Sequence, residues 1–183
     1  MRKIPLTYFI TFTCYGTWLH GDDRGSVDED HRKFDTPFVE ANTARYESMR
    51  KKMKESPLFL IEEQRALVAA VIAEVCVFRN WTLHECNVRS NHVHVVVSSD
   101  ADPDKIMKDF KAYATKRLRE SEEVEQSRTV WTEGGSTRYL WTETSLSAAM
   151  EYVRNHNYRA RGVSQALCVC LAYATGSVVE SNL

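Results

Sequence analysis

Two of the six histidines in the chain, His92 and His94, are separated by one residue within the segment NHVHVVV at positions 91–97. In an extended strand successive side chains point to opposite faces, so both imidazoles project from one face, about 6–7 Å apart. The valines between and after them fill the other face. Two imidazoles held side by side on a strand form half of a divalent-metal site. The alternative is a partly exposed strand that carries two histidines without a ligand.

A second group of reactive side chains lies on a helix predicted from Ser145 to about Asn157. Residues four apart share one face of a helix, so Tyr152 and His156 lie together beside its apolar stripe. A tyrosine hydroxyl next to a metal is a candidate nucleophile. Its ordinary pKa of about 10 means that it needs a base or a cation to activate it. The alternative is an interfacial tyrosine with a packed ring and a hydrated hydroxyl.

Length and composition predict one domain with a real core, since the chain has 183 residues and is 43% hydrophobic. The net charge is −1, from 24 basic and 25 acidic residues, so any nucleic-acid surface must be local. The five cysteines include no CxxC pair, which argues against a disulfide framework or a zinc ribbon. The beginning of the chain does not look like a signal peptide, and no apolar run is long enough for a bilayer. We therefore expect a cytoplasmic protein with no membrane partner.

Hydrophobic periodicity and turn residues predict a surface helix over 41–56 and a core built from seven further elements. In order these are a strand, a helix, two strands that form a hairpin, a helix, a strand and an extra helix. The predicted ranges are 8–14, 61–79, 81–88, 92–97, 103–120, 138–141 and 145–157. Asp102 caps the second core helix, and Thr144 caps the last one.

This order predicts an α+β fold of the ferredoxin-like split βαβ type. It is an antiparallel sheet with helices on one face, plus an extra C-terminal helix that carries the tyrosine. We expect residues 1–162 to form the domain and residues 163–183 to be a C-terminal tail without an assigned role.

The helix that begins at Pro103 carries a basic surface that would pair with phosphates, and Arg2 and Lys3 can add to it. The alternative is an ordinary solvated helix face. Its basic residues are Lys105, Lys108, Lys111, Lys116, Arg117 and Arg119.

Aromatic residues offer further candidates. Tyr113 is a rival nucleophile, although its spacing from Phe110 and Ala114 predicts a core position. Trp131, Tyr139 and Trp141 can stack on bases or pack in the core.

Several motifs occur here in a characteristic order: a strand with Asn-His-Val-His, a basic amphipathic helix, a Tyr-Leu-Trp strand and a Tyr-Val helix. This order resembles the single-tyrosine HUH transposases of bacterial insertion sequences and their relatives, the REP-associated tyrosine transposases. The similarity runs from the first strand to about Gly162. It implies a metal-dependent strand transferase and endonuclease acting on single-stranded DNA, often folded into a hairpin. A tyrosine attacks a phosphodiester, leaving a 5′-phosphotyrosine link and a free 3′-hydroxyl.

Carried over residue by residue, the resemblance implies that His92 and His94 are the paired ligands of Mg²⁺ or Mn²⁺ and that Tyr152 is the nucleophile. Family members usually have Gln or Asn about four residues after the tyrosine as a further ligand. Here His156 and Asn157 stand at that point, and either one can coordinate. The resemblance also implies a homodimer, in some members with each site shared between subunits.

Two other functions fit parts of the same pattern. One is a domesticated relative that binds hairpin DNA as a regulator without cleaving it. The other is a nucleotide hydrolase of the histidine-triad type. That class has a third histidine at the position where this chain has Val96.

Overall fold

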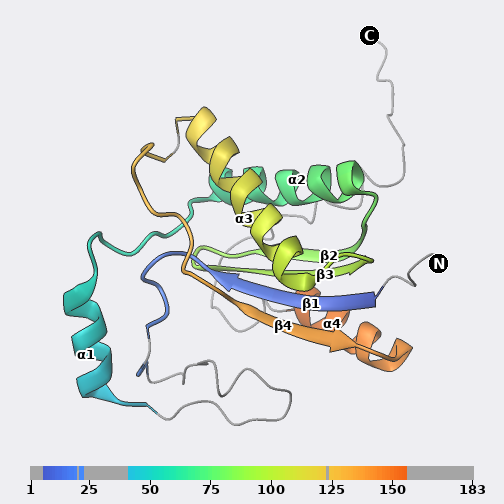
Figure 1. Ribbon diagram of the computed structural model, residues 1–183, viewed down its shortest axis with the longest axis horizontal. Helices are drawn as coiled ribbons and strands as arrows, with labels where there is room; N and C mark the ends of the chain where they lie inside the picture. The colour runs from blue at the N-terminus through green and yellow to red at the C-terminus, as the bar shows by residue number, and fades with distance from the viewer. Residues whose placement is uncertain (1–5, 20, 23–40, 123, 156–183) are drawn as a thin grey trace.

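A computed structural model of the chain describes residues 6–19, 21–22, 41–122 and 124–155 (Figure 1). Its centre is a four-stranded antiparallel sheet in the order β2-β3-β1-β4. The strands are β1 (Leu6–Thr13), β2 (Thr82–Val88), β3 (His92–Ser99) and β4 (Ser136–Leu140). The histidine strand β3 is therefore internal, and β4 is an edge.

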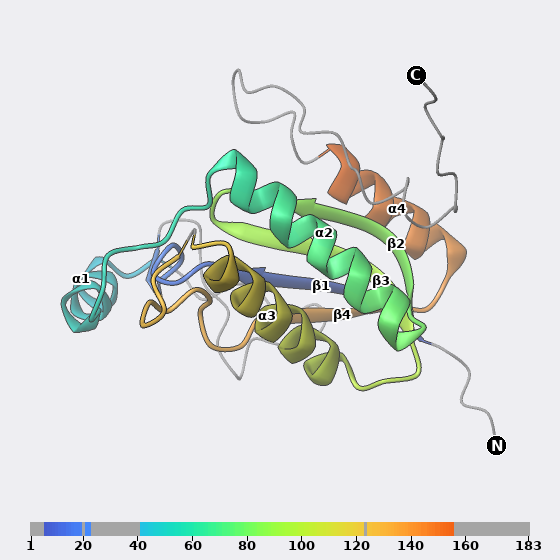
Figure 2. The same cartoon turned by 90° about the horizontal axis from the view of Figure 1, so that it is seen from above.

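Four helices accompany the sheet within the described residues: α1 (Thr43–Lys52), α2 (Glu62–Arg79), α3 (Pro103–Glu120) and α4 (Glu143–Asn155). α2 and α3 lie side by side on one face, and α4 lies on the other, whereas α1 stands apart at one end (Figures 1 and 2). The predicted α+β class and antiparallel sheet are confirmed, and the extra helix packs against the face opposite the other two.

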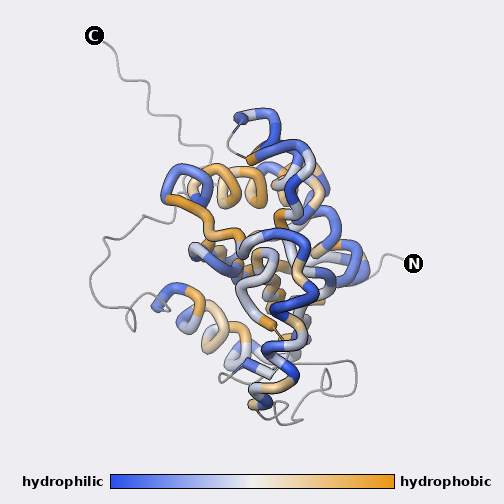
Figure 3. The backbone as a smooth tube through the Cα atoms, turned by 90° about the vertical axis from the view of Figure 1, so that its left-hand side faces the viewer, coloured by the Kyte–Doolittle hydropathy of each residue, from blue (hydrophilic) through white to orange (hydrophobic). Residues whose placement is uncertain are grey.

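The face under α2 and α3 holds the main core. The alternating residues of β3, Val93, Val95 and Val97, are fully buried there. Ile10 of β1 and Phe110 of α3 are buried in the same cluster. Figure 3 shows the hydrophobic stretches gathered mainly toward the middle of the molecule. Burial of this apolar surface is the main force that stabilises the fold.

The opposite face has a much smaller apolar cluster. Val96 of β3, Leu140 of β4 and Val153 of α4 are buried together, and Phe9 and Met150 pack against them. Val153 is the one buried residue of α4. The remainder of this sheet face carries polar side chains, so α4 depends on polar contacts as well as on apolar packing.

The helix ends follow local chemistry. Asp102 caps α3 as predicted, because its Oδ1 accepts a hydrogen bond from the Asp104 amide at 2.9 Å. The prediction that Thr144 caps the last helix is wrong. α4 already begins at Glu143, and the Thr142 hydroxyl accepts from the Ser145 amide at 3.1 Å. Both threonines precede the apolar stripe, and the stripe alone does not decide between them.

The remaining sequence predictions concern the cysteines, membrane-spanning segments and residues near the two ends of the chain. Cys14, Cys76 and Cys86 are buried free thiols. Across the described ranges, no helix has the length and apolarity needed to cross a membrane. His156, Asn157, Arg2, Lys3 and the tail 163–183 lie outside the described residues.

Candidate active site

His92 and His94 lie on the α4 face of β3, as the alternation predicts, while Val93 and Val95 point into the main core. The centroids of the two imidazole rings are 4.6 Å apart. His94 is buried and His92 is half-buried. Because β3 is hydrogen-bonded on both sides, the two rings stand on a rigid support.

Each imidazole is oriented by a hydrogen bond at Nδ1. The Nδ1 atom of His94 lies 2.8 Å from Oγ1 of Thr11, its register partner on β1. The Nδ1 atom of His92 lies 2.8 Å from Oδ1 of Asn91. In metalloproteins such a bond on one ring nitrogen fixes the ring, and the opposite nitrogen binds the metal.

Tyr152 lies beside this pair. Its ring centroid is 5.6 Å from that of His94 and 5.9 Å from that of Phe9. The side chain is 49% exposed, so solvent and a substrate can reach it. A single chain therefore brings the candidate nucleophile next to the candidate metal ligands without a second subunit.

Two polar contacts hold the end of α4 against β2. Asn87 Nδ2 donates to the Val153 carbonyl at 2.7 Å. Arg154 Nη2 pairs with Glu85 Oε2 at 2.8 Å, and the Glu85 side chain is only 3% exposed. Neither of these two positioning residues of β2 was predicted from the sequence. Their signal was the spacing of Glu85 and Asn87 around Cys86, which puts two polar groups on one strand face.

These histidines fit a divalent metal by donor type and by orientation, since both are imidazoles already held at Nδ1. The part of the chain that the structure describes contains no group of three His, Cys, Asp or Glu side chains arranged for a metal. The described residues thus provide two candidate ligands, His92 and His94.

The six basic residues predicted to bind nucleic acid lie on α3, across the sheet from the histidines. Several of them are in ion pairs: Lys105 with Asp109 at 2.9 Å, Lys116 with Glu120 at 3.7 Å, and Arg117 with Glu74 at 2.8 Å. The structure therefore does not gather this set around His92 and His94.

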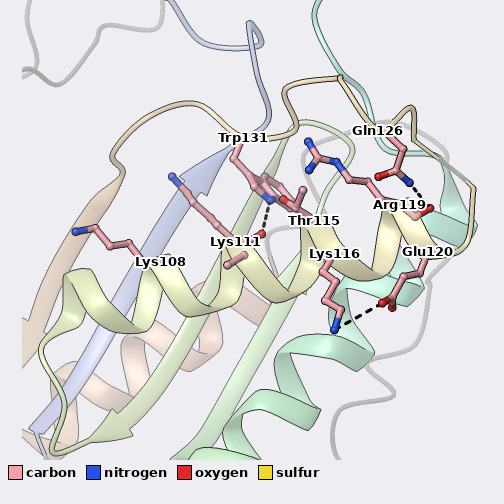
Figure 4. A pocket seen from close by; sticks show the side chains of 9 residues that line it. Lys108, Lys111, Thr115, Lys116, Arg119, Glu120, Gln126 and Trp131 are labelled. Atoms are coloured by element: carbon pink, nitrogen blue, oxygen red, sulfur yellow. Dashed lines mark hydrogen bonds and ion pairs between the residues drawn. The ribbon is translucent and has the colours of Figure 1, made fainter.

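Four of those residues line a hollow of about 780 Å³ beside α3 (Figure 4): Lys108, Lys111, Lys116 and Arg119. Lys111 Nζ donates to the carbonyls of Thr132 and Gly134. Burial lowers the pKa of Lys111 to about 8, and the nearby carboxylate of Glu133 opposes that shift. The hollow is thus cationic, with one lysine of reduced basicity.

The aromatic candidates have three different environments. Trp131 is buried in the main core, and its indole N–H donates to the Lys111 carbonyl at 3.1 Å. Tyr139 and Trp141 are exposed and stack on each other, with centroids 5.1 Å apart and planes at 6°. The predicted core position of Tyr113 is wrong, because this side chain is 38% exposed on α3. It faces the groove between α2 and α3, away from the histidines.

A sequence model of the family described as IS200-like transposases matches residues 38–156, which is more than half of the chain. No protein of curated function matches. The fold is similar to that of a REP-associated tyrosine transposase bound to a REP hairpin, with a TM-score of 0.52 and 12% identity over 90% of this chain and 76% of that one. A predicted transposase from Deinococcus radiodurans R1 has a TM-score of 0.47 and 11% identity, over 85% of this chain and 97% of that one. At these identities the structural likeness concerns the fold.

Proposed function

This chain belongs to the IS200-like transposase family, and on that premise we propose that it cleaves and rejoins single-stranded DNA through a covalent phosphotyrosine. Tyr152 is the nucleophile, His92 and His94 are metal ligands, and His156 or Asn157 is the further ligand. The observation that carries this proposal is the 5.6 Å separation between the rings of Tyr152 and His94 within one chain.

The proposed reaction is a transesterification. The Tyr152 oxygen forms a bond to phosphorus, and the bond from phosphorus to the 3′-oxygen of the DNA breaks. The phenolic proton passes to solvent, which reaches this half-exposed side chain, and the leaving 3′-oxygen takes up a proton. The phosphodiester energy is retained in the 5′-phosphotyrosine, so a 3′-hydroxyl can reverse the step without ATP.

A divalent cation, Mg²⁺ or Mn²⁺, would supply Lewis-acid polarisation of a non-bridging phosphate oxygen. His92 and His94 would hold it, with His156 or Asn157 as the further ligand. Thr11 and Asn91 keep the two rings in place. Asn87 and Glu85 keep the end of α4, and with it Tyr152, beside them. Holding nucleophile and ligands on separate rigid elements supports the proposal, because it presets the geometry of attack.

We propose single-stranded or hairpin DNA as the substrate, since the REP-associated relative was solved with a REP hairpin. The predicted basic residues of α3, which partly line the hollow, would contact the phosphates of a duplex stem on the other face of the sheet. A homodimer is the assembly that the family resemblance implies. Since Tyr152 and His94 of the same chain are already adjacent, the proposed pairing of tyrosine and histidines does not require a residue from a second subunit.

The test is to incubate the protein with 3′-labelled hairpin oligonucleotides and Mn²⁺ and to resolve covalent adducts on a denaturing gel, since the 5′-phosphotyrosine link retains the 3′ fragment of the DNA. We expect an adduct that Tyr152→Phe abolishes and that Tyr113→Phe retains. Hairpin binding without an adduct would favour the non-catalytic regulator instead. An adduct lost in Tyr113→Phe but kept in Tyr152→Phe would show that the nucleophile is misassigned. Metal-independent hydrolysis of nucleotides would favour a histidine-triad-like hydrolase, although Val96, at the position of the third histidine, is buried.

A further inference from the structure

An arginine of the edge strand β4 shares the sheet face with the histidine pair. Arg138 is the register partner of Phe9, and Phe9 in turn is the partner of Val96. The Phe9 ring contacts both His94 and Tyr152, with centroids 5.4 Å and 5.9 Å away. The Arg138 side chain is exposed. Directly paired cross-strand neighbours are about 5 Å apart, so Arg138 lies next to Phe9 on the sheet face that Tyr152 covers.

A second arginine lies on the other side of the pair. The Arg89 amide donates to the His92 carbonyl at 2.8 Å, and the next pair along the hairpin is Val88 with Val93. Arg89 is therefore directly opposite His92, one residue past the end of β2 and two residues after Asn87, which contacts α4. Arg89 is half-buried.

The charges of this row favour an anion. Arg89 and Arg138 place two guanidinium cations at the ends of a series of paired strand positions that includes the histidine pair. Arg154, the nearby cation of α4, is already paired with Glu85. The row runs diagonally across the sheet, from Arg89 opposite His92, past His94, to Arg138 at the level of Val96.

We propose that Arg89 and Arg138 bind two backbone phosphates of the substrate strand, one on each side of the phosphate that the histidine pair and Tyr152 address. This inference rests on the proposed function for the identity of the central phosphate. Three strand spacings across the sheet, about 14 Å, and four residues along β3, about 13 Å, separate the backbones of the two arginines, so they contact different phosphates. A guanidinium suits this role because it offers a planar pair of N–H donors to phosphate oxygens.

The first test measures equilibrium binding of a single-stranded oligonucleotide without divalent metal, so that it does not depend on cleavage. The variants are Arg89→Gln and Arg138→Gln, with Arg50→Gln on the exposed surface of α1 as the matched control. Each site variant should bind about tenfold more weakly. Each should also make the slope of log K against log salt less negative by about 0.7, the value for one single-strand phosphate contact. Site variants that bind like Arg50→Gln would overturn the proposal.

The second test removes single phosphate charges with methylphosphonate linkages and repeats the binding measurement. A methylphosphonate at the phosphate that Arg138 contacts should weaken binding by the wild-type protein but not by Arg138→Gln. A methylphosphonate at a different position should weaken binding by the wild-type protein but not by Arg89→Gln. Arg138→Lys should keep the charge-dependent slope and lose part of the affinity. Losses that are the same in variant and wild type at every linkage would refute the contacts. A protein that shows these couplings but forms no adduct would refute the proposed catalysis while supporting the phosphate sites.

Discussion

The ion pair between Arg154 and Glu85 gives a quantitative test of how α4 is held. We consider the substitution Arg154→Met, which keeps the length and apolar contacts of the side chain but removes its charge. In the native site Arg154 Nε and Nη2 both donate to Glu85 Oε2, at 3.1 and 2.8 Å. The substitution leaves the Glu85 carboxylate, 3% exposed, without this partner.

Removing one member of a fully buried ion pair costs about 3–5 kcal/mol, because the remaining charge stays desolvated. Here the Arg154 side chain is 60% exposed, so water can partly replace it. We therefore expect a smaller cost of about 2 kcal/mol, borne by α4 rather than by the whole domain. That corresponds to about a 30-fold increase in the local opening of α4, since 1.4 kcal/mol is a factor of ten.

Native-state hydrogen exchange of the α4 amides measures this directly, with the amides of β3 as the internal reference. Exchange should accelerate in α4 and stay unchanged in β3. The double variant Glu85→Leu with Arg154→Met should recover most of the protection, because the buried charge is then gone as well. Two results would contradict this expectation: a loss of less than about 0.5 kcal/mol in the free energy of opening of α4, or effects of the two single substitutions that simply add in the double variant. Either result would show that the pair contributes no more than an ordinary surface ion pair.

Further predictions concern the hydrogen bond between Thr11 and His94, the partly buried Lys111, and Gly135, which immediately precedes β4. Thr11→Val should weaken Mn²⁺ binding about 10- to 100-fold, whereas Thr11→Ser should keep it, because the hydroxyl fixes the His94 ring; calorimetric titration measures both. Since the pKa of Lys111 is about 8 when folded and 10.5 ordinarily, the unfolded chain binds more protons between these values. Stability should therefore rise with pH across that window, and Lys111→Met should flatten the rise in denaturant titrations. Gly135→Ala should destabilise the domain by about 1–3 kcal/mol, because its Cβ would lie 2.7 Å from the backbone carbonyl oxygen of Thr11, which cannot move aside as the nearby Met107 side chain can; thermal unfolding measures it.

The elements that sequence predicts well are those whose own periodicity identifies the buried face. Strict alternation in β3 puts the two histidines together, and the burial of Val93, Val95 and Val97 agrees with it. The helix α3 was bounded correctly because Asp102 and a first-turn proline mark its start.

The relations between elements were harder to foresee. An amphipathic helix shows which of its own faces is apolar, but it does not show which face of the sheet it covers. The sequence therefore did not reveal that α3, with its lysines, and α4, with Tyr152, lie on opposite faces. For the same reason Arg89 and Arg138 attracted no notice. Their proximity to the histidines depends on the register of three strand pairings that only the fold supplies.

The two halves of the candidate site differ in how firmly they are held, and this difference follows from the two faces of the sheet. The histidines stand on an internal strand whose other face is sealed by the main core, so their positions have the stability of the whole domain. Tyr152 stands on a helix with one buried residue, Val153, and two polar contacts to β2. Substitutions at Glu85 or Asn87 should therefore alter the position of the tyrosine without disturbing the imidazoles. On the proposed function, substitutions at Glu85 or Asn87 should lower covalent adduct formation more than metal affinity, because His92 and His94 stand on β3, whereas Tyr152 and the further ligand, His156 or Asn157, depend on the attachment of α4.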